Sequence, residues 1–504
     1  MALFKPSERR FLEPVARLAY CNHFLPERIE HERAALGSAF IPGEPVWSAS
    51  VAEPDLPRPN LAPIQSKLEP LLDTIRERLV RTPDVGASEL ATYEDCVHYM
   101  LYLRYYPQFL AARGNWKFYR DFLADWKHYL EIPGKRFETT LEPVHVFACF
   151  RQIQRAFHHI FDNIIGNSLA AARLRASIWH SIFTHDMRRY RRILYRKMAD
   201  FPTLITGPSG TGKELVARAI AGSRYVPFNP DRLEFTTEKE EIFLPLNVAA
   251  LSPTLVESEL FGHRRGSFTG ATGDRKGWLE ICPSLGSVFL DELAEMDLAI
   301  QVKLLRVIET RRFSPVGDTA LREFHGKLIA ATNRSLPVEI RERRFREDLY
   351  YRLCADLIET PSLAEQIENS PDVLDELVLF MTRRAVGAEA QQAFPEIRQW
   401  IRTHLPADYR WPGNYRELEQ CVRNIVIRRS YRPIEQTSGE ASSDAFFDDF
   451  RAGRLDSAEV LSYYAAVVYR QTGSYEEAAR RLKLDRRTVK AKVREYLTRN
   501  ANAD

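Results

Sequence analysis

Residues 207–214 constrain the fold more than any other part of the chain. They form a glycine-rich turn with a lysine near its end, and they read Gly207, Pro208, Ser209, Gly210, Thr211, Gly212, Lys213 and Glu214. The apolar pair Leu204–Ile205 precedes this turn, and residues 215–220, which have helical spacing, follow it. Strand, glycine loop and helix in this order are typical of a phosphate-binding P-loop, in which backbone N–H groups and the lysine face the phosphates. An ordinary glycine-rich turn is the alternative.

A second motif supplies the acids that such a site needs. Residues 286–290 have the pattern of a buried strand, and Asp291 and Glu292 follow directly. Parallel strands bring their carboxyl ends to the same sheet edge as the P-loop. Asp291 is therefore predicted to hold Mg²⁺, and Glu292 to orient or deprotonate the attacking water. Glu214 stands where Ser or Thr usually ligates magnesium, so the metal must be held mainly from elsewhere. Together the motifs predict a module that hydrolyses ATP.

Composition limits the class of protein without identifying it. A chain of 504 residues suggests about three domains, and 45% apolar with 28% charged residues describes a soluble globular protein. The net charge of +3 is small, so any affinity for nucleic acid must come from a local basic patch. The six cysteines show no metal-binding spacing, which favours reduced thiols in a cytoplasmic protein. No apolar run approaches the ~18 residues of a spanning helix, so no membrane partner is expected.

The first 180 residues read as helical. Apolar residues recur at helical steps between 147 and 164, and the segment from 99 to 129 is rich in aromatic residues. Packed helix core explains the aromatic residues, and a ligand pocket is the alternative. His158 and His159 are interpreted as surface or core histidines. A proline-rich stretch, residues 42–63, separates a short first segment from the longer helical part. We expect an input domain whose ligand the sequence does not identify.

Two segments around the P-loop carry weaker signals. The basic stretch 181–200 is most simply a solvated helix face, although contact with the adenine or with a neighbouring subunit is the alternative. Residues 223–241 are polar and contain two prolines, which predicts a surface insertion. Asn247 directly follows the apolar residues 243–246, a position from which its amide can reach the catalytic carboxylate.

Residues 257–271 form another unusual stretch. Glycines at 262, 266, 270 and 273 surround a single aromatic residue, Phe268. This spacing is unfavourable inside a helix and could present Phe268 and Thr269 at the tip of a loop. A turn whose phenylalanine packs back into the core is equally consistent with the spacing.

These motifs, in this order, resemble those of the sigma-54-dependent transcriptional activators, also called bacterial enhancer-binding proteins. Residues 266–271 resemble the family's Gly-Ala-Phe-Thr-Gly-Ala loop, and the family P-loop also ends in Glu, which accounts for Glu214. The remaining matching segments are 257–263, 291–292, 301–307, 330–334, 345–353 and 411–418. The resemblance extends over about residues 181–430.

The resemblance implies roles for individual residues. Asn333 matches sensor I, which reads the γ-phosphate, and Arg416 matches sensor II on a helical lid. Arg346 and Arg352 match arginine fingers that act on ATP in the neighbouring subunit, so hydrolysis would require a ring, which is hexameric in this family. The alternative for these arginines is surface ion pairing with Glu347 and Asp348.

The sigma-54 contact and the departures from the family also follow from the resemblance. Asn247 matches the residue that couples Glu292 to the loop, and Phe268 and Thr269 match the residues that touch sigma-54. Ser267 replaces a family alanine, which keeps the Phe–Thr pair. Residues 361–366 replace a segment with arginines, so coupling through the lid is expected to differ from the family pattern.

The C-terminal region carries the basic patch. After a polar linker, residues 458–469, 475–482 and 486–497 have the spacing of three helices, with Asp485 as an N-cap. Arg486, Arg487, Thr488 and Lys490 begin the third helix, and they are the candidates for DNA contact. The segment is similar to the Fis-like DNA-binding domain that ends this family. One short recognition helix binds weakly, so a dimer that reads two half-sites is expected.

The expected fold is multidomain. A helical N-terminal input domain (1–180) precedes an AAA+ α/β P-loop subdomain (181–361) and its helical lid (362–430); a linker (431–455) and an all-α helix-turn-helix domain (456–504) follow. The expected function is that of a sigma-54-dependent regulator that binds upstream DNA and uses ATP and Mg²⁺ in a homo-oligomeric ring to remodel sigma-54 RNA polymerase. The alternative is an ATP-responsive DNA-binding repressor that does not act on sigma-54.

Overall fold

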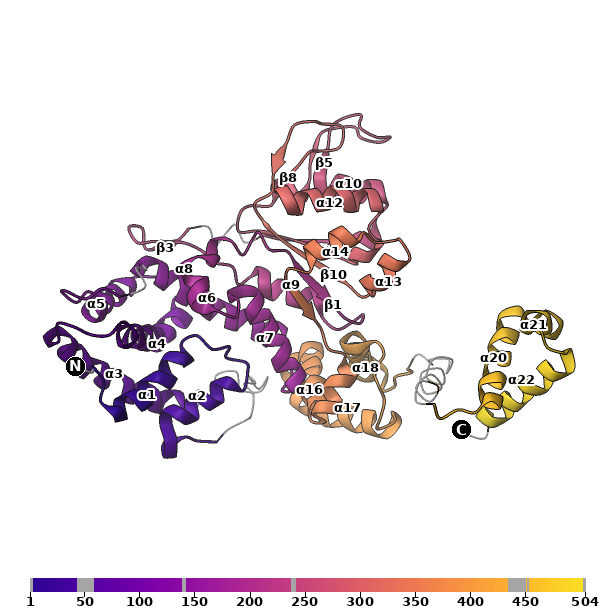
Figure 1. The fold of residues 1–504 in the computed structure, drawn as a ribbon, viewed down its shortest axis with the longest axis horizontal. Coiled ribbons are helices and arrows are strands. Elements are labelled where there is room, and N and C mark those ends of the chain that lie inside the picture. The colour runs from indigo at the N-terminus through magenta and orange to yellow at the C-terminus, as the bar shows by residue number, and fades with distance from the viewer. Residues whose placement is uncertain are drawn as a thin grey trace. The chain divides into compact units, whose positions relative to one another are not determined.

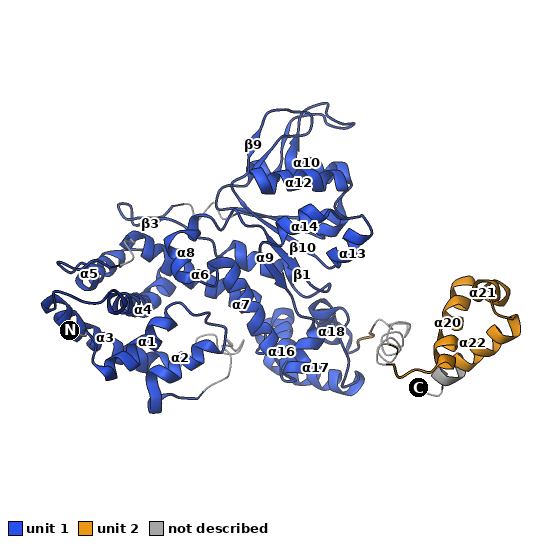
Figure 2. Ribbon diagram, viewed as in Figure 1, with its two compact units in different colours: residues 1–430 blue, residues 431–504 orange. Residues whose placement is uncertain are grey.

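The computed structural model describes residues 3–42, 59–137, 142–236, 242–433, 450 and 453–501. The described chain divides into two compact units, residues 1–430 and 431–504 (Figure 2). Most of the proline-rich stretch, the end of the predicted insertion and most of the predicted linker lie outside the described residues. Within the described residues, no helix combines the length and the apolar character needed to cross a membrane.

A five-stranded parallel sheet forms the centre of the first unit, with strand order β11-β1-β10-β7-β4 (Figure 1). Its strands are β1 (Thr203–Thr206), β4 (Phe243–Asn247), β7 (Ser287–Asp291), β10 (Lys327–Thr332) and β11 (Leu357–Glu359). The P-loop follows β1, and Asp291 and Glu292 lie at the end of β7. Since all strands run in one direction, these segments leave the sheet at the same edge.

Both faces of the sheet are buried. Alternate strand residues point to opposite faces, and the residues of each face belong to a different core. Ile205, Phe289 and Ile329 belong to one core, which also contains α9 (Lys213–Ala221). Their neighbours Leu204, Val288 and Leu328 belong to a second core, with α12 (Leu298–Thr310) and α14 (Glu347–Leu353). The near-continuous apolar strands are therefore those of a sheet covered on both sides.

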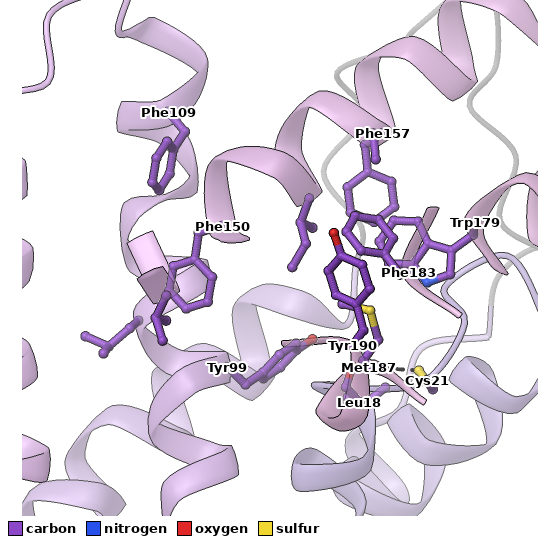
Figure 3. Close-up of a cluster of buried hydrophobic side chains, with 14 of the residues drawn as sticks. Leu18, Cys21, Tyr99, Phe109, Phe150, Phe157, Trp179, Phe183, Met187 and Tyr190 are labelled. Atoms are coloured by element: carbon purple, nitrogen blue, oxygen red, sulfur yellow. Dashed lines mark hydrogen bonds between the residues drawn. The ribbon is translucent and has the colours of Figure 1, made fainter. Parts of the chain in front are cut away.

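The region before β1 is helical, as predicted. Its α-helices are α1 (Pro6–Leu18), α2 (Glu27–Leu36), α3 (Leu61–Arg81), α4 (Ala87–Ala111), α5 (Tyr119–Leu130), α6 (Pro143–Asn163), α7 (Leu169–Phe183) and α8 (Met187–Arg192). The aromatic residues pack together in the core of this region, as Figure 3 shows for Tyr99, Phe150, Phe157 and Trp179. This core is continuous with the first face of the sheet, so α6 and α7 pack directly against α9.

The predicted surface insertion is partly buried, which corrects the interpretation of its sequence. Residues 228–235 form a short hairpin of β2 (Phe228–Asn229) and β3 (Glu234–Phe235). Phe228 and Phe235 are 5% and 7% exposed, and their rings lie 4.8 Å and 6.1 Å from the ring of Phe147 on α6. Burial of two phenylalanines outweighs the polar composition of the flanking residues.

Two other small hairpins extend from the sheet domain at the top of the view in Figure 1. One pairs β5 (Gly262–His263) with β6 (Arg275–Lys276), and the other pairs β8 (Arg312–Phe313) with β9 (Arg322–Glu323). Helix α10 (Pro253–Phe261) leads into the first hairpin and packs against α11 (Trp278–Ile281), which follows β6. The loop with Phe268 and Thr269 connects β5 to β6.

Four helices after β11 form a bundle at the P-loop end of β1 (Figure 1). They are α15 (Leu363–Asn369), α16 (Val373–Val386), α17 (Ala390–His404) and α18 (Asn414–Arg428), and α13 (Leu336–Arg341) precedes them in the sheet domain. Ser362 and Glu365 form a capping box at the start of α15. The segment that departs from the family pattern is therefore a well-capped helix start.

From residue 453 to residue 501 the described part of the second unit contains three helices: α20 (Ser457–Thr472), α21 (Tyr475–Leu482) and α22 (Arg486–Ala501). Their shared core is small and is made of Ala465, Val468, Ala478, Ala479, Val489 and Val493. Lys483 ends α21 in the left-handed conformation, and the amide of Arg487 donates to Asp485 Oδ1 at 2.7 Å. The three predicted helices and the capping role of Asp485 are confirmed.

Candidate functional site

The P-loop has the backbone that its glycines predict. Gly207, Gly210 and Gly212 have φ values of 139°, 78° and 86°, and Gly212 is the N-cap of α9. Lys213 Nζ donates to the carbonyls of Gly207 at 2.9 Å and Pro208 at 3.0 Å. Burial lowers the pKa of Lys213, although Glu292 and Asp291 partly oppose this effect. The ammonium group is thus held over the loop, at the start of a helix whose N-terminus favours anions.

A cavity of about 610 Å³ lies over this loop. It is lined by residues 209–215 of the P-loop, by Asp291 and Glu292, by Tyr415, Arg416 and Glu419 of α18, and by residues of α16. The sequence-predicted residues Lys213, Asp291, Glu292 and Arg416 therefore meet at one site. This volume is typical of a pocket for a small organic ligand.

The helical bundle after β11 is joined directly to the P-loop. Asn414 Nδ2 donates to the Ser209 carbonyl at 2.8 Å, and the amide of Tyr415 donates to the Gly210 carbonyl at 3.1 Å. Arg416 Nη1 lies 3.4 Å from Ser209 Oγ. Three hydrogen bonds therefore connect the P-loop to the start of α18.

Glu292 has an unusual backbone for a non-glycine residue. Its φ is 54°, in the left-handed region, and its amide donates to Asp291 Oδ1 at 3.0 Å. Such conformations cost free energy and are concentrated at functional sites. Here the left-handed turn ends β7 and keeps both carboxylates on the cavity wall.

Asn247 lies beside this pair but does not bond to it. The backbone of Asn247 is in register with Asp291, since β4 and β7 are neighbours. Its side-chain oxygen accepts from the Ala250 amide at 3.1 Å. No hydrogen bond joins Asn247 to Glu292 within the described residues, so the coupling implied by the resemblance is not made in this conformation.

Asn333, Arg346 and Arg352 are exposed. They are not among the described residues that line the cavity. Asn333 directly follows β10, between the P-loop strand and the strand of Asp291. Arg346 pairs with Asp348 at 2.6 Å, and Arg352 pairs with Glu309 at 3.0 Å. Ion pairing within the chain thus occurs at both arginines, with Glu309 in place of the predicted Glu347.

The glycine loop holds its phenylalanine in an intermediate position. Phe268 is half-buried, with its ring edge-on to His263 at 4.9 Å, whereas Thr269 is exposed. Arg264 pairs with Asp274 at 2.6 Å and Asp318 at 2.9 Å, which joins the two small hairpins. Neither sequence alternative describes the loop fully, because Phe268 packs on the hairpin and not in the core of the sheet domain.

In the second unit, the four candidate DNA-contact residues Arg486, Arg487, Thr488 and Lys490 are exposed at the start of α22. Arg486 pairs with Glu476 of α21 at 2.9 Å. The exposed, basic helix start is the arrangement that the sequence predicts.

Sequence reasoning missed part of the cavity wall. Residues 162–165, at the end of α6, and Leu174 of α7 also line the cavity. Gln366 of α15 connects α18 to the start of α7, because its Nε2 donates to the hydroxyl of Tyr415 and its Oε1 lies 3.3 Å from Ser168 Oγ. Only the helical spacing between 147 and 164 marks this segment, and it carries no chemical motif.

Replacing Gly207 by alanine should disrupt the P-loop. A Cβ atom there would lie 2.2 Å from Thr360 Oγ1 and 2.6 Å from the Thr360 carbonyl, at a φ that side chains rarely adopt. We expect the melting temperature to fall by roughly 5 °C and ATP binding to weaken. Gly86→Ala is the control, because a Cβ at Gly86 meets nothing within 4 Å. An equal, small effect of both substitutions would contradict the packing argument.

Comparisons with known proteins agree with the motifs. Residues 183–359 match the family model of the Sigma-54 interaction domain. The regulatory protein LuxO of Vibrio vulnificus is 38% identical over 279 residues, which are 54% of this chain and 56% of LuxO. The DNA-binding transcriptional regulator NtrC of Azospirillum brasilense is 33% identical over 346 residues, 61% of this chain and 67% of NtrC. The chain spans about half the length of the first curated relatives that it matches.

Proposed function

Because the chain belongs to the family of sigma-54-dependent transcriptional activators, we propose that it uses ATP hydrolysis in an oligomeric ring to open promoters bound by sigma-54 RNA polymerase. The observation that carries this proposal is the cavity in which the P-loop lysine, two strand-end carboxylates and a lid arginine meet. The input domain would be residues 1–180, and the nucleotide-binding subdomain would be residues 181–361. The lid would be residues 362–430, and the DNA-binding domain would be residues 456–504.

The P-loop would bind ATP through its backbone N–H groups and Lys213. The carboxylates of Asp291 and Glu292 fit a hard divalent cation, since magnesium prefers oxygen ligands. Asp291 would hold Mg²⁺, and when bound the ion would neutralise charge on the β- and γ-phosphates. Glu292 would position the attacking water and accept its proton. Arg416 would sense the phosphates from the lid, and Asn333 would do so from the end of β10.

Arg346 and Arg352 would act on the ATP of a neighbouring subunit. Their exposure and their place outside their own cavity support this role, because a finger must reach across an interface. Each would leave its acidic partner, Asp348 or Glu309, when a subunit docks. A hexameric ring would supply one finger pair to every site.

The loop between β5 and β6 would contact sigma-54 through Phe268 and Thr269. Thr269 is exposed, and Arg264 ties the loop to the second hairpin, so the two hairpins would move together. Asn247 would pass the state of Glu292 toward this loop, which requires that its side chain leave the Ala250 amide. The exposed residues at the start of α22 would bind upstream DNA, with two subunits reading two half-sites.

Substitution of Thr269 by alanine should separate hydrolysis from promoter opening. We expect the ATPase rate to stay within about twofold, because Thr269 is exposed and does not line the described cavity. Open-complex formation on a sigma-54 promoter should be lost. Thr272→Ala, an exposed threonine in the same loop, should retain both activities. The assay uses high protein concentration on a generic sigma-54 promoter.

The outcomes distinguish the two candidate functions. If the unaltered chain hydrolyses ATP but never opens the promoter, a DNA-binding repressor that uses ATP to control its assembly becomes the better hypothesis. If Thr269→Ala opens the promoter as well as the unaltered chain does, the loop is not the working contact.

A further inference from the structure

A second large cavity lies at the edge of the sheet opposite the P-loop. Its volume is about 520 Å³, and its walls come from segments that precede three strands: residues 195–200 before β1, 284–285 before β7 and 324–327 at β10. Residues 223–227, after α9, complete it. The strands of this sheet are five to six residues long at β7 and β10, so about 15 Å of sheet separates this edge from the P-loop.

The lining of this second cavity is strongly cationic. Five of the lining side chains are Arg196, Lys197, Arg224, Arg311 and Lys327. Among the described lining residues, Asp200 is the only carboxylate, and it lies 3.7 Å from Lys197 Nζ and 3.9 Å from Arg311 Nε. Among the described lining side chains, cationic groups therefore outnumber carboxylates in a partly enclosed space.

Lys327 is the most deeply buried of these cations, with 2% of its surface exposed. Its Nζ donates to the carbonyls of Phe201 at 2.9 Å and Met198 at 3.3 Å. Burial lowers its pKa to about 8, although Asp356 nearby opposes the effect. Carbonyl groups orient the ammonium group without neutralising it. Asp356, which also accepts from Ser181 and Thr203, compensates its charge only in part, and a buried charge that is only partly compensated is costly.

Backbone carbonyls also accept hydrogen bonds from Arg224 and Arg311. Arg224 Nη1 donates to the Gly286 carbonyl at 2.6 Å, and Arg311 Nη2 donates to the Gly326 carbonyl at 2.5 Å. Arg311 also stacks over the ring of Phe324 at 4.6 Å. These contacts fix the guanidinium groups in place, and a fixed guanidinium is well suited to bidentate contact with phosphate oxygens.

We propose that this cavity binds a small phosphate-bearing organic anion that bridges the helical region and the ATPase. Arg196 and Lys197 come from the segment that follows the N-terminal helices, whereas Arg224, Arg311 and Lys327 come from the nucleotide-binding part. The volume exceeds that of a lone phosphate group, and Tyr195, Tyr225 and Phe324 provide apolar wall for an organic part. The ligand would tie the two regions together and stabilise their arrangement.

Calorimetric titration of the full chain with pyrophosphate, at constant ionic strength, tests the proposal. The P-loop also binds phosphates, so the titration is made in a Lys213→Ala background. Binding should persist there, and Arg311→Gln and Arg196→Gln should each weaken it about tenfold, the loss expected for one charge-assisted contact. Arg196 is exposed, so its substitution spares the core. Arg192→Gln is the matched control, because Arg192 is exposed and does not line the cavity.

Three results would overturn the proposal. Loss of all pyrophosphate binding in Lys213→Ala would assign the binding to the P-loop. Equal affinity in Arg311→Gln, Arg196→Gln and Arg192→Gln would show that the cationic cavity is not the site. Equal affinity for sulfate would show that the cavity attracts anions only by its charge. Persistent binding that is specific for pyrophosphate and sensitive to Arg311 and Arg196 supports the assignment.

Discussion

Replacing Arg352 by alanine is expected to reduce ATP hydrolysis by about 10³-fold or more while leaving ATP binding nearly unchanged. The side chain is 60% exposed and pairs only at the surface with Glu309, so its loss should not unfold the chain. An arginine that stabilises charge on the transferring phosphoryl group acts in the transition state, so its removal lowers the rate and not the affinity. Arg346→Ala should behave in the same way. Arg341→Ala, at an exposed arginine of α13, is the control.

Mixing two inactive variants tests whether the finger acts between subunits. A subunit with Arg352→Ala keeps its own Glu292, and a subunit with Glu292→Gln keeps its fingers. An equal mixture should recover roughly a quarter of the original activity, because that fraction of interfaces pairs an intact Glu292 with an intact finger. If the arginine acts within its own subunit, the mixture stays inactive.

The nucleotide site was largely predictable because its chemistry is local in sequence. A phosphate loop needs glycines and a lysine within eight residues. The acidic pair Asp291–Glu292 could be identified because it directly follows a buried-strand pattern. The parallel sheet then brings the two motifs together, as β1, β10 and β7 are neighbours in the strand order. Sequence periodicity also predicted the helices before β1 and the three helices of the second unit.

The parts that were not predicted depend on packing between distant segments. Phe147 and Phe228 are 81 positions apart, and nothing in their local sequence indicates that their rings lie 4.8 Å apart. The same holds for Gln366, whose contacts with Ser168 and Tyr415 join three segments. The second cavity could not be predicted from the sequence, because its cations are scattered along the chain and come together only near the beginnings of the strands. Examples are Arg196, Arg224 and Lys327.

The shared core changes how regulation of the ATPase should be understood. A separate input domain would act on the nucleotide site through a linker, whereas here α6 and α7 pack on α9, the helix that starts at Lys213. The end of α6 also forms part of the cavity wall. Any rearrangement of the N-terminal helices would therefore shift the P-loop helix directly, and we propose this packing as the route by which the region controls hydrolysis.

The Glu292→Gln variant should bind ATP but hydrolyse it at least about 10²-fold more slowly, because the amide cannot accept the proton of the attacking water. The substitution keeps size and shape, so the left-handed turn at φ 54° is retained. Affinity for a fluorescent ATP analogue should stay within about threefold, since Lys213 and the P-loop are unchanged. By contrast, Lys213→Ala should lose the binding itself.

Glu295→Gln provides the matched control for this variant. Glu295 follows three residues later, pairs with Arg334 and does not line the cavity. The Glu295→Gln variant should therefore hydrolyse ATP at the rate of the original chain. If Glu292→Gln hydrolyses ATP at the control rate, Glu292 is not the base, and Asp291 becomes the carboxylate to replace next. If Glu292→Gln is slow and also binds sigma-54 stably in the presence of ATP, the step at Glu292 is the one that releases the Phe268–Thr269 loop. Hydrolysis and remodelling would then be coupled at a single carboxylate.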